Sequence, residues 1–305
     1  MHRLPDETGI TVALLIEIVL FSILSPYFMT GENILNVSLQ ISITAIIAVG
    51  MTFVILTGGI DLSVGSVVAF AGIVTTAVLQ VSSLPLAIAA GLLVGALSGA
   101  FAGLFITRLK ITPFIVTLAL MTIWRGAAFI YTSGRPIWEL PEGFGVIGGG
   151  RVAGMPIPSI IMVGTFAGAY VVLHHTRFGR YVYAVGGNAA AARLSGVRTD
   201  RVVMIVYVVC GLLTALSGIL LASRLSSGQP NAGLSYELDV IAAVVVGGTS
   251  LFGGRGSILG TFIGSVLIGV LRNGLNLLNI ESYVQQVVVG VVILVAVLVD
   301  RLRER

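Results

Sequence analysis

The sequence predicts an all-α protein that crosses a membrane many times, and composition and hydrophobic segmentation are the two observations behind this prediction. Of the 305 residues, 56% are hydrophobic and only 10% are charged, whereas a soluble domain averages about 25% charged residues. The hydrophobic residues form runs near the ~20 residues that a helix needs to cross a bilayer. We therefore expect a single transmembrane domain over residues 1–305, rather than a soluble enzyme with one anchor.

The hydrophobic runs predict about ten transmembrane helices. Two runs, at 238–251 and 258–272, are short, so they are candidates for broken or re-entrant segments rather than full crossings. An even number of crossings would place both termini on the same side of the membrane. The predicted spans lie near residues 10–29, 39–57, 65–81, 86–106, 114–132, 158–174, 204–224, 238–251, 258–272 and 283–299.

The basic residues predict which side faces the cytoplasm. Cytoplasmic loops carry an excess of Arg and Lys, so the net charge of +4 requires no nucleic-acid partner. Placing the N-terminus in the cytoplasm puts 12 of the 17 basic residues on the cytoplasmic side, so we predict cytoplasmic N- and C-termini, a cytoplasmic loop at about 175–203 and a periplasmic, Gly- and Pro-containing loop at about 133–158. The basic residues assigned to the cytoplasmic side are Arg3, Arg108, Lys110, Arg177, Arg180, Arg193, Arg198, Arg201, Arg255, Arg301, Arg303 and Arg305.

The loop from 175 to 203 contains a short helix with both ends marked. Asn188 is a preferred N-cap, because its side-chain oxygen can accept from the first free backbone N–H groups. The alanines from 189 to 192 favour a helix, and Gly196 supplies a left-handed stop. Two interpretations stand: a docking element for a partner, or a helix that rests on lipid headgroups through its arginines. The residues alone favour neither.

A second polar interruption, TGGIDLSVG at 57–65, lies between two apolar runs. A charge exposed to lipid at the bilayer centre costs ~2.5–3.5 kcal/mol on insertion scales, so we expect Asp61 to face the protein interior, a water-filled cavity or the headgroup boundary. One interpretation is a broken helix that lines a pathway. The other is a tight turn in which Asp61 caps the helix beginning near Val64. Arg125 is a candidate partner for Asp61, or it reaches outward to the interface.

Glycines predict two further features. The stretch GGTSLFGG at 247–254 resembles GGIDLSVG when Gly58 is aligned with Gly247, and both stretches are predicted to run in the same direction, as in a parallel internal repeat. A close helix–helix contact is also predicted, because small residues at i, i+4 spacing let backbones approach. The glycines with this spacing are Gly91, Gly95, Gly99 and Gly103, with Gly260 and Gly264 on a later span.

Four blocks of the sequence resemble one family. They are TGGIDLSVGS at 57–66, TPFIVTLALMTIWRGAAFIYTSGRPI at 112–137, GGNAAAARLSGV at 186–197 and VVVGGTSLFGGRGSILGTFIG at 244–264. In order and over most of the chain, they resemble the membrane permease of bacterial ATP-binding-cassette importers for ribose and related sugars. Branched-chain amino-acid permeases are more distant relatives in the same superfamily.

The resemblance implies a mechanism and a set of partners. A multi-pass permease in the bacterial inner membrane would pair with a second permease subunit, the same or a paralogue, and would receive sugar from a periplasmic binding protein. A cytoplasmic ATPase would bind ATP and Mg²⁺, so this chain would hold no cofactor. The sequence agrees, because it contains no G-x-x-x-x-G-K-[ST] phosphate loop.

The resemblance places the ATPase-coupling segment on the capped helix and so favours the docking interpretation. The four alanines after Asn188 depart from relatives, which often carry a more polar residue there. The coupling residues are Gly187, Asn188, Ala191, Ala192, Arg193, Leu194, Ser195 and Gly196.

The sequence leaves several alternatives open. The candidate pathway residues are Asp61, Ser63 and Asn231, and neither catalytic residues nor a metal site are expected. An ion-coupled carrier or channel that uses Asp61 and Arg125 is one alternative, although such a carrier would more often show several intramembrane carboxylates. An importer permease for a non-sugar solute and a membrane scaffold are others. Ribose, xylose, galactose, arabinose and inositol all remain candidate substrates.

Overall fold

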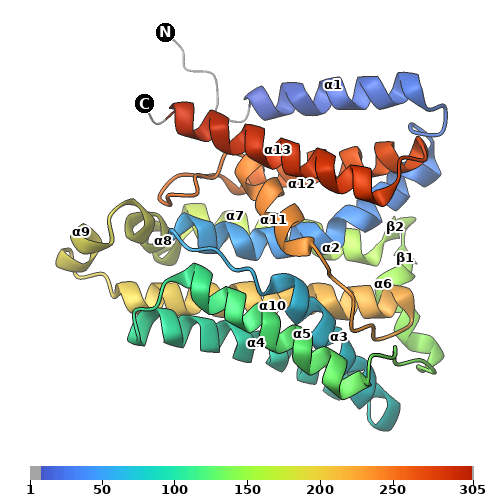
Figure 1. Ribbon diagram of the computed structural model, residues 1–305, viewed down its shortest axis with the longest axis horizontal. Coiled ribbons are helices and arrows are strands. Elements are labelled where there is room, and N and C mark those ends of the chain that lie inside the picture. Colours follow the sequence, from blue (N-terminus) through green and yellow to red (C-terminus); the bar gives the residue numbers. More distant parts are fainter. Residues whose placement is uncertain (1–7, 304–305) are drawn as a thin grey trace.

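The structure, a computed structural model, describes residues 8–303 and is a bundle of long helices with one two-stranded hairpin (Figure 1). The second half of α2 is buried on all sides and contacts α10, so these two helices form the core. The elements are α1 (Thr8–Leu24), α2 (Gly31–Leu56), α3 (Val64–Val81), α4 (Leu84–Arg108), α5 (Pro113–Thr132), η1 (Glu142–Phe144), α6 (Gly145–Gly149), β1 (Arg151–Val152), β2 (Met155–Pro156), α7 (Ile157–His175), α8 (Arg177–Gly187), α9 (Ala189–Leu194), α10 (Thr199–Leu225), α11 (Tyr236–Val246), α12 (Ile258–Leu277) and α13 (Ser282–Arg303).

The helices confirm the prediction of an all-α, polytopic membrane protein, and a helix lies at each predicted span. Within the described residues, seven are long and apolar enough to cross a membrane, namely α2, α3, α4, α5, α7, α10 and α12. Two shorter apolar helices lie at Thr8–Leu24 and Ser282–Leu298. The prediction that the run at 258–272 is too short is wrong, because α12 continues to Leu277 and has 20 residues.

The run at 238–251 is broken, as its length suggested. Helix α11 has 11 residues, which at 1.5 Å per residue span about 16 Å, roughly half of the ~30 Å hydrocarbon core. Residues 226–235 form a series of turns that runs from the end of α10 back to the middle of the bundle, where α11 begins (Figure 1).

A second irregular segment enters the bundle from the opposite end. Residues 57–63 follow α2 and turn back toward the middle, where α3 begins (Figure 1). The start of α3 meets the segment 226–235 there, because a Cβ atom on Gly65 would lie 2.3 Å from the carbonyl oxygen of Gly233. Only glycine permits this approach. Each segment therefore brings irregular backbone to the centre of the molecule.

The glycine spacing produces the close helix contacts that it predicts. A Cβ atom on Gly95 would lie 2.1 Å from the carbonyl oxygen of Gly211, and one on Gly99 would lie 2.2 Å from that of Tyr207, so α4 and α10 pack backbone to backbone. Gly264 makes the same contact with Ala243, where a Cβ atom would lie 2.0 Å from the carbonyl oxygen, and thereby joins α12 to α11.

The two ends of the bundle differ. Helices α8 and α9 project from one end, toward which α1 begins and α13 ends, whereas α6, β1 and β2 lie at the other (Figure 1). Five arginines of the 175–203 loop gather at the α8–α9 end, as expected for a cytoplasmic surface. Arg3 and Arg305 lie outside the described residues. The orientation in the membrane stays a prediction.

Candidate docking site and central segments

Helix α9 has the two caps that its sequence predicts. The side-chain oxygen of Asn188 accepts a hydrogen bond from the backbone N–H of Ala191 at 2.9 Å. At the other end, Gly196 has a φ of +84°. The N–H of Gly196 donates to the carbonyl oxygen of Arg193, and that of Val197 donates to the carbonyl oxygen of Ala192. Both ends are closed by local hydrogen bonds, so six residues suffice for a defined helix.

The predicted coupling residues form an exposed tip at one end of the molecule (Figure 1). Ala192 is 6% exposed and packs against the body, whereas Leu194 is 91% exposed. The remaining members of the set, Gly187, Asn188, Ala191, Arg193, Ser195 and Gly196, are also exposed. Helices commonly dock by laying exposed apolar side chains into a groove on a partner protein, so Leu194 is a candidate anchor.

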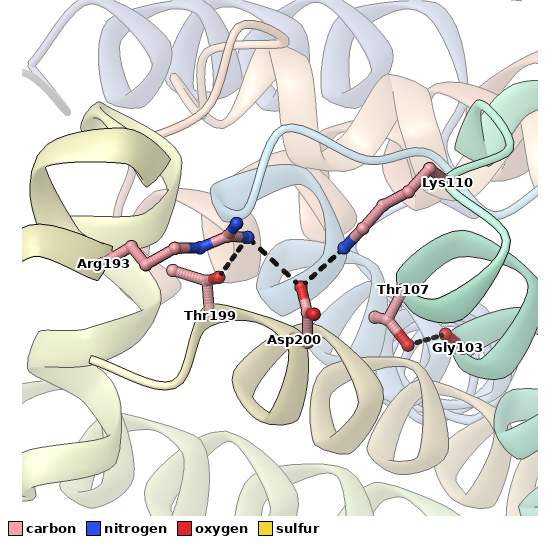
Figure 2. Close-up of polar contacts among 6 residues, drawn as sticks. All are labelled: Gly103, Thr107, Lys110, Arg193, Thr199 and Asp200. Atoms are coloured by element: carbon pink, nitrogen blue, oxygen red, sulfur yellow. Dashed lines mark hydrogen bonds and ion pairs between the residues drawn. The ribbon is translucent and has the colours of Figure 1, made fainter. Parts of the chain in front are cut away.

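An ion-pair network holds the tip in place, and Figure 2 shows its members. Asp200, in the first turn of α10, accepts from Lys110 at 3.0 Å and from Arg193 at 3.5 Å. Arg193 also donates to the hydroxyl of Thr199 at 3.1 Å. The side chains of all three ion-pair members are more than half exposed or close to it, so each pair contributes only ~0.2–1 kcal/mol. Their main effect is to fix the position of the tip, because they link α9 to α10 and α10 to the α4–α5 turn.

A groove of about 780 Å³ lies beside the tip, between the end of α4 and the start of α10. Its lining includes four arginines, Arg108, Arg193, Arg198 and Arg201, against one acid, Asp200. The groove therefore favours an acidic partner surface. Sequence reasoning identified Arg193 but not its pairing with Asp200, although Asp200 is the one acid in the loop and was visible as such.

Asp61 lies in a tight turn but does not cap α3, which corrects that part of the second interpretation: the N-cap residue is Ser63, and no side chain bonds to the free N–H groups of the helix. Asp61 is 3% exposed, and its Oδ1 accepts from the backbone N–H of Ser63 at 2.9 Å and from the Ser63 hydroxyl at 2.6 Å. These bonds close the turn directly before α3. Asp61 and Ser63, two of the candidate pathway residues, are thus brought together on the segment that enters from the α8–α9 end.

Arg125 does not pair with Asp61, which corrects that expectation. Its Nη1 donates to the carbonyl oxygens of Pro230 and Ala232, at 2.7 and 2.8 Å. The guanidinium therefore holds the other irregular segment, 226–235, against α5. Asn231, the third candidate pathway residue, lies between these two carbonyls in the chain and is exposed. These contacts explain how a charged residue is tolerated within a span: the guanidinium donates charge-assisted hydrogen bonds to two backbone oxygens.

The two glycine-rich stretches that resemble each other, at 58–65 and 247–254, both follow the end of a helix with the same turn, but the structural match is shifted by one residue from the predicted alignment. The N–H of Gly58 donates to the carbonyl oxygen of Ile55, and the N–H of Gly248 donates to that of Val245. These two glycines have φ values of +79° and +87°. Gly58 therefore corresponds to Gly248, not to Gly247. Both helices end at the α8–α9 end, in agreement with the predicted common direction (Figure 1).

Comparison with known proteins places this architecture in a family. The family model described as "Branched-chain amino acid transport system / permease component" matches residues 33–297. The ribose import permease protein of Escherichia coli strain K12 is 50% identical over 299 residues, 96% of this chain and 93% of the relative. That of Bacillus subtilis strain 168 is 52% identical over 299 residues, with 97% and 93% covered.

A third relative, the L-arabinose transport system permease protein of Escherichia coli strain K12, is 41% identical over 304 residues, 99% of this chain and 93% of the relative. No solved structure matches the chain. The family model and the relatives each cover far more than half of the chain. The chain therefore belongs to the family of multi-pass membrane permease components of ATP-binding-cassette importers that includes the ribose and arabinose permeases.

Proposed function

We propose that this chain is the permease that carries ribose, or a closely related monosaccharide, through the bacterial inner membrane. Sequence identity supports ribose over arabinose as the substrate. The ribose permeases of Escherichia coli and Bacillus subtilis are 50% and 52% identical to the chain, whereas the arabinose permease is 41% identical. Coverage of more than nine-tenths of both chains means that the likeness extends over the whole transport domain.

We further propose that a separate ATPase drives transport by docking on α9. The observation that carries this proposal is the capped tip with Leu194 almost fully exposed beside a groove lined by arginines. Such a tip offers an apolar anchor and a positive surface to one partner. ATP and Mg²⁺ would bind to that partner, since the sequence holds no phosphate loop.

The pathway would run along the two irregular segments, 57–63 and 226–235, near the contact of Gly65 with Gly233. Asp61 and Ser63 on one segment and Asn231 on the other are the proposed lining residues. A sugar needs hydrogen-bonding groups as it passes the apolar core, and irregular backbone at membrane depth supplies them. A second permease subunit would close the path, and a periplasmic binding protein would deliver the sugar.

The test is uptake of radiolabelled ribose into proteoliposomes that hold the complex of permease and co-purified ATPase. Purified binding protein is added outside, and ATP is enclosed within. We expect uptake that requires ATP and that unlabelled ribose suppresses more strongly than arabinose or leucine does. Uptake without ATP would instead support an ion-coupled carrier. Suppression by leucine alone would support a permease for a non-sugar solute.

A further inference from the structure

Three stretches of backbone meet without intervening side chains at the base of the α8–α9 arm. They are the end of α8 at Gly186, the end of α2 at Leu56 and the loop after α11 at Gly254. The N–H of Gly254 donates to the carbonyl oxygen of Leu56 at 2.9 Å. A Cβ atom on Gly186 would lie 1.7 Å from that oxygen and 2.5 Å from the nitrogen of Gly254. We call this three-way contact the glycine joint.

Two consecutive glycines in the loop after α11 form that loop's part of the joint. Gly253 and Gly254 have φ values of +85° and +73°, which L-residues rarely adopt and glycine adopts readily. A Cβ atom on Gly254 would lie 2.7 Å from the Cα atom of Gly187, and one on Gly253 would lie 2.9 Å from the nitrogen of Gly58. The loop thus touches both α8 and the first residues after α2.

One side-chain hydrogen bond spans the same contact. The hydroxyl of Tyr183, on α8, donates to the carbonyl oxygen of Gly256 at 3.0 Å. Burial raises the pKa of Tyr183, so its hydroxyl keeps the proton that it donates. On the other face of α8, the ring of Phe178 stacks on Phe53 of α2, with centroids 6.4 Å apart. The arm is therefore seated firmly on α2 and on the loop after α11.

The joint touches the two elements that reach the centre of the molecule. Leu56 directly precedes the segment 57–63, which carries Asp61, and Gly254 lies in the loop that directly follows α11. The far end of α11 is also fixed, because Asp239 in its first turn pairs with Arg272 of α12 at 2.5 Å. A displacement of α8 would thus reach both central elements through one contact.

We propose that the glycine joint is the connection through which movement of the α8–α9 arm repositions the segment 57–63 and α11, with Gly186 and Tyr183 as positioning residues. This proposal rests on the proposed docking of an ATPase at α9. The close backbone packing means that a displacement of α8 is passed on to its neighbours, because packed elements without flexible side chains between them shift together.

The test measures sugar imported per ATP hydrolysed by the assembled transporter. Gly186→Ala puts a methyl group into the joint, and Tyr183→Phe removes its hydrogen bond at nearly constant volume. The matched control is Gly168→Ala in α7, outside the joint and outside the docking tip, because a Cβ atom on Gly168 meets nothing within 4 Å. We expect both test variants to bind the ATPase and hydrolyse ATP within twofold of wild type. Imported sugar per ATP should fall at least tenfold in Gly186→Ala and several-fold in Tyr183→Phe, but not in the control.

An unchanged ratio in the assembled variants would overturn the proposal, and so would a parallel loss of uptake and hydrolysis. If Gly186→Ala does not assemble, the ratio in Tyr183→Phe decides. Failure of the proposed function is a separate outcome, because the wild-type transporter would then show no ATP-dependent uptake at all.

Discussion

Truncation of Leu194 to alanine tests the docking site with little risk to the fold. The side chain is 91% exposed, so the chain alone should lose almost no stability. If the ATPase buries this side chain, the three carbons removed cost about 0.8 kcal/mol each, or about 2.4 kcal/mol. Because about 1.4 kcal/mol is a tenfold change, we expect the ATPase to bind about 50-fold more weakly.

The measurement is a titration of the ATPase against the permease in lipid nanodiscs, read by fluorescence anisotropy. Leu93→Ala is the matched control, since Leu93 is another exposed leucine, 57% exposed in the middle of α4, away from the tip. Thermal unfolding of each variant without the ATPase shows whether the fold is intact. We expect Leu93→Ala to bind as wild type does.

Equal affinity for Leu194→Ala and wild type would refute the assignment of α9 as the docking tip. Loss of affinity accompanied by a lower melting temperature of the isolated permease would refute the physical reasoning. The side chain would then be part of the permease's own packing, contrary to its exposure.

Three further predictions concern the network, the helix packing and the central segment. Asp200→Asn removes the negative charge that both Lys110 and Arg193 contact. ATPase affinity should therefore fall, but less than in Arg193→Glu, because the new glutamate is also repelled by Asp200. Equal losses of affinity in the same titration would contradict a positioning role for the network. Gly99→Ala forces α4 away from α10, so denaturant unfolding should show a loss of stability of ~1–3 kcal/mol. Its control, Gly168→Ala, has open space around the new methyl group and should be neutral or stabilising by up to ~1 kcal/mol. Asp61→Asn keeps an oxygen that accepts from Ser63 and should retain most of the ribose uptake; abolished uptake in a folded variant would favour an ion-relay role for Asp61.

The length of the hydrophobic runs predicted most of the fold, and the glycine spacing predicted its close helix contacts. A long apolar run has few alternatives to a spanning helix, so each predicted span coincides with a helix. The limits of α12 were missed because Arg272 and Asn273 interrupt the hydrophobic run without ending the helix. Arg272 is tolerated there because it pairs with Asp239, and Asn273 because its amide bonds to that of Asn33. Such partners lie far away in the sequence.

The candidate site was predictable where its causes are local. The caps of α9 depend on residues within one turn, so Asn188 and Gly196 could be identified in advance. Arg125 depends on carbonyl groups more than 100 residues away, and backbone acceptors leave no mark in a sequence. The expected pairing with Asp61 failed for this reason: an acid is visible as a partner for an arginine, whereas a bent segment of backbone is not.

The most direct test of the central claim is chemical labelling of the α9 tip from each side of the membrane. The sequence has one cysteine, Cys210, which is buried, so a new cysteine from Ser195→Cys can be followed with a membrane-impermeant maleimide. We predict labelling in inverted vesicles, no labelling in right-side-out vesicles, and protection when the ATPase is present. Labelling from the outer side, or unchanged labelling with the ATPase bound, would contradict the account.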